Sequence, residues 1–114
     1  MRKLLVLILL APLSAAAAEP QPQPAFQPLA FLVGHCWKGT FPDGKQTDEH
    51  CFQWVYGGRY LRDVHTLRAP GRPDHVGESV YYVDPSSKKI RYLYFEDTGG
   101  ISHGNVSVGV PLSS

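Results

Sequence analysis

The stretch GHCWKGTFPDGKQTDEHCFQW, residues 34–54, decides the fold. It contains both cysteines of the chain, Cys36 and Cys51, on either side of a Pro-Asp-Gly turn signal. If the chain reverses at Asp43 and Gly44, the two cysteines lie at equal distances from the turn and therefore directly opposite each other. The sequence predicts a hairpin with the cysteines in cross-strand register.

A four-residue loop over 42–45 suits this hairpin, because its proline lacks the N–H that a shorter loop would need. It places the cysteines at a non-hydrogen-bonded pair, where Cα atoms approach to about 4.5 Å, a distance that suits a disulfide. We therefore favour a Cys36–Cys51 disulfide, worth roughly 3 kcal/mol for a loop of about 15 residues. Free thiols and a metal site are the alternatives. Strand neighbours point to opposite faces, so His35 and His50 cannot join the cysteines around one ion.

A second reversal at 57–58 sets the next hairpin, in which His50 lies opposite His65 and Phe52 lies opposite Asp63. The face that carries these side chains is the more apolar one, and we assign it to the interior. The candidates for lining a ligand cavity on this face are His35, Trp37, His50, Phe52, Trp54, Asp63 and His65.

Three interpretations of this cluster stay open. The polar groups can be hydrogen-bonded members of a partly wet interior, or they can line a ligand cavity. Two imidazoles and a carboxylate can also bind a transition metal or perform acid–base chemistry. We expect no catalytic residues, no metal ligands and no cofactor. A register slip of one residue would move the whole cluster to the other face.

The first 18 residues, MRKLLVLILLAPLSAAAA, have the pattern of a secretory signal peptide, with a basic start, a short apolar run and small residues before the cleavage point. The apolar run is too short to span a bilayer. We place cleavage after Ala18 and expect a periplasmic or secreted protein. Such a compartment is oxidising, which again favours the disulfide.

Charge excludes some partners. Removing Arg2 and Lys3 with the signal peptide leaves 11 − 2 = 9 basic residues against 10 acidic ones, a net charge of −1 with neutral histidines. Such a balance predicts neither nucleic acid nor an anionic membrane as a partner.

Beyond the signal peptide, residues 19–28 form a Pro/Gln-rich stretch that we expect to be an extended tether. Residues 29–114 form one domain, in which turn signals separate short runs rich in β-branched and aromatic residues. The fold class is therefore all-β, an antiparallel meander of about six strands. The strands are predicted near 34–41, 46–56, 59–68, 76–83, 90–96 and 101–109. In the hairpin of 76–83 with 90–96 both faces hold apolar residues, so the pattern does not assign its inner face.

The segment LAFLVGHCWKGTF, residues 29–41, resembles the opening of small exported bacterial calycin-like barrels, which include lipocalin-like and nitrobindin-like proteins. Their pattern is an apolar helical turn followed by Gly-x-Trp-x-Gly, and here one extra residue stands between Gly34 and Trp37. The pieces VYGGRYLRD and GESVYYVDPSSKKI are also similar, so the resemblance covers roughly residues 29–105.

The resemblance implies eight to ten strands around a cavity for an apolar or haem-like ligand. This chain offers about six, which predicts an incomplete up-and-down barrel whose C-terminal strands are missing. No residue matches the haem-ligating histidine of nitrobindin-like proteins, so haem is not implied. A strand at 101–110 would leave an open edge, through which a second copy could pair.

We therefore expect an exported, non-enzymatic protein that binds a small, partly apolar molecule in a β-barrel cavity. One alternative is a metal-assisted or acid–base enzyme that uses His50, Asp63 and His65. The other is an interaction module that recruits a partner through its open strand edge.

Overall fold

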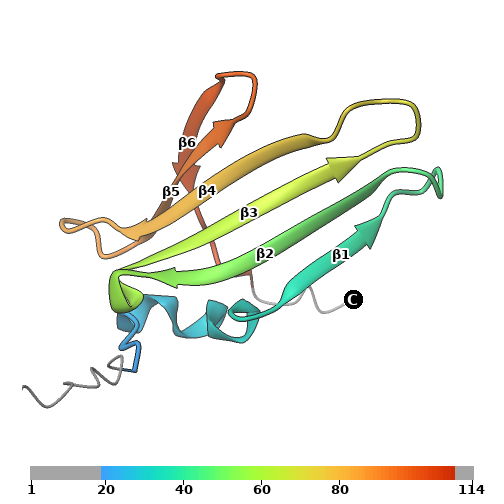
Figure 1. Cartoon of the computed structure of the whole chain (residues 1–114). Coiled ribbons are helices and arrows are strands. Elements are labelled where there is room, and N and C mark those ends of the chain that lie inside the picture. The colour runs from blue at the N-terminus through green and yellow to red at the C-terminus, as the bar shows by residue number, and fades with distance from the viewer. Residues whose placement is uncertain (1–18, 110–114) are drawn as a thin grey trace, which may run out of the picture.

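Six antiparallel strands follow one another as a meander, and each strand pairs with the next in chain order (Figure 1). The computed structural model describes residues 19–109, and the predicted signal peptide lies outside them. The strands are β1 (Cys36–Thr40), β2 (Thr47–Val55), β3 (Tyr60–Arg68), β4 (His75–Val83), β5 (Ile90–Glu96) and β6 (Ile101–Asn105). Within the described residues β1 and β6 have one partner strand each, so the sheet is open. The predicted antiparallel meander is confirmed.

Two short 3₁₀ helices, η1 (Pro24–Leu32) and η2 (Tyr56–Gly58), accompany the sheet. The stretch expected to be an extended tether up to residue 28 is helical from Pro24 onward, so that expectation is wrong for its second half. Proline is tolerated at the start of a helix, where its missing N–H would have no helical partner. Phe26 is fully buried and fixes this segment against the sheet.

The first hairpin has the predicted register. Cys36 lies opposite Cys51, and the two residues form a disulfide with Cα atoms 4.1 Å apart. In the loop, Gly44 has a φ of +71°, a conformation that favours glycine. The Asp43 carboxylate accepts hydrogen bonds from the backbone N–H groups at positions 45 and 46, at 2.8 and 2.9 Å. Local turn chemistry therefore fixes the register of β1 against β2.

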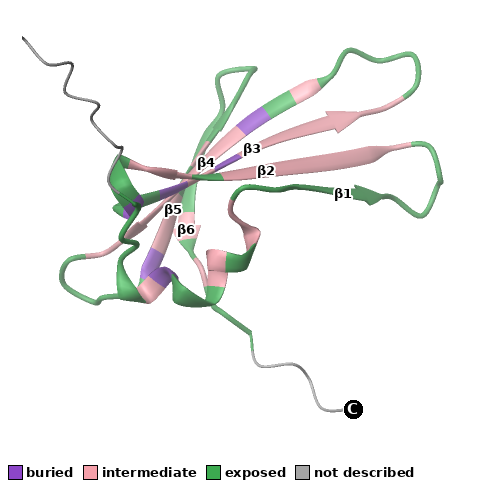
Figure 2. Ribbon diagram, turned by 60° about the horizontal axis from the view of Figure 1, so that its bottom comes forward, coloured by how far each residue is buried: buried purple, intermediate pink, exposed green. Residues whose placement is uncertain are grey.

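The core lies at one end of one face of the sheet, which we call the inner face because η1 packs on it (Figure 1). Phe26, Leu61 and Ile90 form the buried cluster, and partly buried side chains from η1, from the inner face and from the residue after β6 surround it. Figure 2 shows that buried positions are few and that β1 is exposed along its length. The other end of the inner face is left without a covering element among the described residues.

The registers of β3, β4 and β5 assign the inner face of the second half. Leu61 lies opposite Tyr81, and Tyr81 lies opposite Tyr92. Tyr94 follows on the same face, opposite Ser79. The inner face therefore carries a group of tyrosines beside the histidines of β2 and β3.

We predict that replacing both cysteines, in a Cys36→Ser/Cys51→Ser variant, lowers the free energy of unfolding by about 2–4 kcal/mol, because the unfolded chain regains the entropy of an open 15-residue loop. Urea unfolding of the variant and of the oxidised protein measures the difference. Thiol reduction of the unsubstituted protein should reproduce it. An unfolding free energy that neither treatment changes would contradict the stabilising role of the disulfide.

Candidate functional site

Four ionisable side chains and one tyrosine form a continuous hydrogen-bonded chain across the inner face. Alternate residues of a strand share a face, so Asp48 and His50 of β2 point the same way. The β2–β3 register places His65 opposite His50. Neighbouring strands add the two ends of the chain, Asp63 from β3 and Tyr94 from β5.

His50 lies between two carboxylates. Its Nδ1 is 2.8 Å from Asp63 Oδ2, and its Nε2 is 3.1 Å from Asp48 Oδ2. The Asp63 side chain is almost fully buried, with a residue exposure of 4%. Its second oxygen, Oδ1, is buried and has no hydrogen-bond partner among the described residues.

His65 continues the chain. Its Nδ1 is 3.0 Å from Asp48 Oδ1, and its Nε2 is 2.6 Å from the Tyr94 hydroxyl. The His50 and His65 rings stack with centroids 5.1 Å apart and an interplanar angle of 18°. Asp48 therefore bridges the two imidazoles, and each imidazole has an outer partner on its other nitrogen.

A glycine makes this arrangement possible. Gly77 lies opposite His65 in the β3–β4 register, and a Cβ at this position would overlap the His65 ring and the Tyr94 side chain. Gly39 lies opposite Asp48, where a Cβ would meet nothing within 4 Å. The cluster is thus packed tightly on its β4 side and has open space on its β1 side.

The carboxylates perturb the protonation of His50. Partial burial lowers the pKa of His50, but the hydrogen bonds and negative charges of Asp63 and Asp48 outweigh burial and raise it. Burial raises the pKa of Asp63. Burial also acts to raise the pKa of Asp48, but the hydrogen bonds and charges of His65 and His50 outweigh it and lower that pKa. The two carboxylates therefore stabilise the protonated form of His50, in which both ring nitrogens can donate hydrogen bonds.

A groove of about 380 Å³ lies beside the cluster on the inner face. It is lined by Leu32, Trp37, His50, Phe52, Asp63 and Tyr81. The indole N–H of Trp37 donates to the Leu32 carbonyl at 3.0 Å, which holds the ring at the end of η1. A second hollow, of about 490 Å³, is lined by inner-face tyrosines and by residues within and just after β6, and it shares Tyr81 with the groove.

The structure brings together four of the seven predicted cavity residues, Trp37, His50, Phe52 and Asp63, as lining of the groove. His65 lies next to them through its stacking on His50. The other two predicted residues have other surroundings.

Trp54 packs against Phe26, with ring centroids 5.9 Å apart, and belongs to the core periphery. His35 is exposed and lies edge-on to Trp37 with centroids 6.0 Å apart, and it does not line the groove. Sequence reasoning missed Asp48 and Tyr94. The signal for Asp48 was present, because it stands two residues before His50 on the same strand and therefore on the same face.

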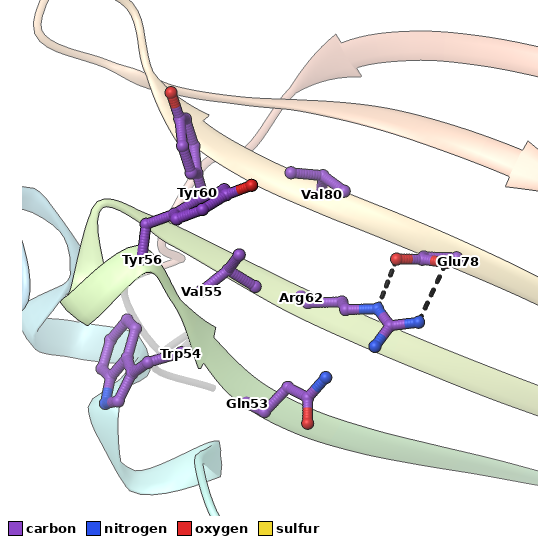
Figure 3. Close-up of a pocket in the computed structure, with 8 residues that line it drawn as sticks. All are labelled: Gln53, Trp54, Val55, Tyr56, Tyr60, Arg62, Glu78 and Val80. Carbon is purple, nitrogen blue, oxygen red and sulfur yellow. Dashed lines mark hydrogen bonds and ion pairs between the residues drawn. The ribbon is translucent and has the colours of Figure 1, made fainter. Parts of the chain in front are cut away.

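A larger hollow, of about 630 Å³, is lined mostly by residues of the opposite face (Figure 3). Arg62 and Glu78 face each other there in a two-contact ion pair. Because these charges satisfy each other, the hollow presents no unpaired charged group to a ligand. The inner-face groove is the better candidate site.

Comparison with protein-family models, with curated proteins and with solved structures finds no match to this chain. In residues 19–109, no helix has the length and apolar character needed to span a membrane. The Cys36–Cys51 disulfide indicates an oxidising, extracytoplasmic location.

We predict that Asp63→Asn lowers the pKa of His50, because the substitution removes the nearer carboxylate. A raised pKa in the folded state means that His50 contributes stability fully below its unfolded pKa of about 6.5, and that this contribution is lost as the pH rises through the folded value. NMR titration of the His50 ring, with urea unfolding over the same pH range, measures both effects.

The control for this titration is Asp74→Asn, which removes an equal charge at a position that pairs with Arg68 and is about half exposed. It should leave the His50 titration unchanged. If Asp63→Asn also leaves it unchanged, the interaction between Asp63 and His50 does not set the protonation of the cluster.

Proposed function

We propose that this protein is an exported, non-enzymatic binding protein that holds a small, partly apolar molecule in the inner-face groove. The observation that carries the proposal is the composition of the groove, in which aromatic walls surround a buried carboxylate. Ligand sites of this kind combine mostly apolar walls with a few placed polar groups, in volumes of about 300–1,000 Å³. The groove of about 380 Å³ falls within this range.

The walls favour a flat or aliphatic ligand part. Trp37 is 43% exposed although it is large and apolar, and its hydrogen bond to Leu32 already fixes its ring. Phe52 and Tyr81 continue this surface from the neighbouring strands. A ligand that covers these rings would remove apolar surface from water at little entropic cost, since the side chains are largely held in place.

The floor of the groove favours a ligand with a hydrogen-bond donor. A buried polar atom without a partner carries a desolvation penalty of about 1–3 kcal/mol, and the penalty is larger for a charged group such as a carboxylate. A hydroxyl or amine of a ligand would satisfy Asp63 Oδ1 if the surrounding side chains shift to admit it. Both ring nitrogens of His50 are already hydrogen-bonded, which supports binding in preference to acid–base catalysis in the groove.

The proposed calycin-like relationship rests on the Gly-x-Trp-x-Gly-like segment after residue 33 and on the six-stranded meander, which is the strand order of an up-and-down barrel. The disulfide supports a periplasmic or secreted location. In this proposal the sheet binds its ligand on an open, half-covered face.

The test uses 8-anilinonaphthalene-1-sulfonate as an apolar probe with the mature, disulfide-bonded protein. We expect Trp37→Ala to weaken binding of the dye about tenfold, the loss typical of an anchoring aromatic. The matched control is Phe95→Ala, because Phe95 is 41% exposed on the opposite face of β5. It should leave the affinity unchanged.

Equal losses in both variants, or a loss only in Phe95→Ala, would contradict binding in the groove. Urea unfolding of both variants shows that the sheet is retained. Native mass spectrometry of protein purified from its own host provides an independent readout, in which an additional small-molecule mass supports the proposal and its displacement by the dye places that molecule in the groove.

A further inference from the structure

A carboxylate lies between two imidazoles at the edge of the groove. One possible ligand atom from each of Asp48, His50 and His65 lies within 4.8 Å of the others. We propose that these three residues form a binding site for a divalent transition-metal ion, with zinc as the best-suited ion. This inference goes beyond the proposed function, because Asp48 and His65 do not line the groove.

The spacing of the ligand atoms fits a single ion. Zinc binds imidazole nitrogen and carboxylate oxygen at about 2.0–2.2 Å, so two ligand atoms at a tetrahedral angle lie about 3.3–3.5 Å apart. Asp48 Oδ2 is 3.1 Å from His50 Nε2, and Asp48 Oδ1 is 3.0 Å from His65 Nδ1. The ligand atoms of the three groups lie within 4.8 Å of one another, so side-chain shifts of about an ångström would bring them around one ion.

The outer partners of the imidazoles are those that a metal site needs. Metal-bound histidines commonly donate their other ring N–H to a carboxylate or another acceptor, which fixes the orientation of the ring. His50 turns its Nδ1 to Asp63, and His65 turns its Nε2 to the Tyr94 hydroxyl. The two nitrogens that face Asp48 would bind the ion, which would replace the protons of their hydrogen bonds to Asp48.

The charge of the cluster and its exposure to solvent are also compatible with a bound divalent ion. Once an ion has displaced the proton from His50, two neutral imidazoles with the Asp48 and Asp63 carboxylates carry a charge of −2, which would balance a divalent cation. The side chains of His50, Asp48 and His65 are 37%, 27% and 15% exposed, so an ion can reach them from solvent. A hollow of about 190 Å³ between Asp48 and the β1 hairpin loop includes Gly39 and provides space beside the site.

The donor set selects the class of ion. Two imidazoles and one carboxylate suit zinc, copper and nickel, whereas calcium and magnesium require mostly oxygen ligands. Three protein ligands leave a fourth position for water or for a group of a bound molecule. His50 belongs both to this set and to the groove, which places the site next to the proposed ligand.

The experiment is isothermal titration of the metal-stripped, disulfide-bonded protein with zinc chloride. We expect one ion per chain, and we expect Asp48→Asn and His65→Gln each to weaken binding by at least about tenfold. Asp63→Asn should weaken binding by about 10–100-fold through loss of the outer partner. The control is His103→Gln, which removes an exposed imidazole from β6, outside the cluster, and should bind zinc as tightly as the unsubstituted protein.

A second readout does not depend on variants. NMR of the unsubstituted protein should show zinc-dependent shifts of His50 Nε2 and His65 Nδ1 and not of the His103 ring. No zinc binding, a loss of affinity in His103→Gln as large as in His65→Gln, or shifts confined to other histidines would overturn the proposal. Trp37→Ala should bind zinc normally, so failure of the groove and failure of the metal site are distinguishable.

Discussion

The alternation of side chains along β2 and β3, fixed in register by two tight turns and one disulfide, is the constraint on which the rest of this structure depends. Because the side-chain period of a strand is two residues, a shift of one position would exchange the two faces completely. The Asp43–Gly44 turn and the Cys36–Cys51 bond exclude such a shift at the first hairpin. Every second side chain of β2 and β3 therefore points to the inner face along the full length of both strands.

The fold is a single sheet with a small core, and this explains both its exposed aromatics and its polar interior. Only η1 covers the inner face in the described part of the chain, and it covers the end near Leu61 and Ile90. Farther along the face no second layer excludes water, so histidines and carboxylates can occupy positions that a closed core would require to be apolar. The groove lies at the boundary between these two regions, which is why its lining mixes aromatic and ionisable residues.

Much of the fold could be predicted from the sequence because turn residues mark the hairpins directly. The pairs Cys36–Cys51 and His50–His65 follow from the positions of the turns alone, and both are confirmed. The start of η1 could not be predicted, since burial of Phe26 stabilises it through contacts with distant strands. The sequence pattern also did not show which face of β4 and β5 points inward, because apolar residues stand on both faces of these strands.

The candidate site was predictable only in part. The alternation placed His50, Asp63 and His65 on one face, but hydrogen bonding between side chains depends on rotamers that a pattern does not encode. Asp48 therefore escaped notice although it bridges both imidazoles, and so did Tyr94, which lies two strands away from His65. Strand register alone also does not predict the open space at Gly39 or the close packing at Gly77.

Cross-strand nuclear Overhauser effects in the oxidised protein test the register most directly. We predict a strong contact between the Hα atoms of Cys36 and Cys51, together with contacts between the ring protons of His50 and His65. Contacts from the Cys51 Hα to the Hα of His35 or Trp37 instead, with no contact between the two imidazoles, would contradict the register and with it the groove and the proposed metal site.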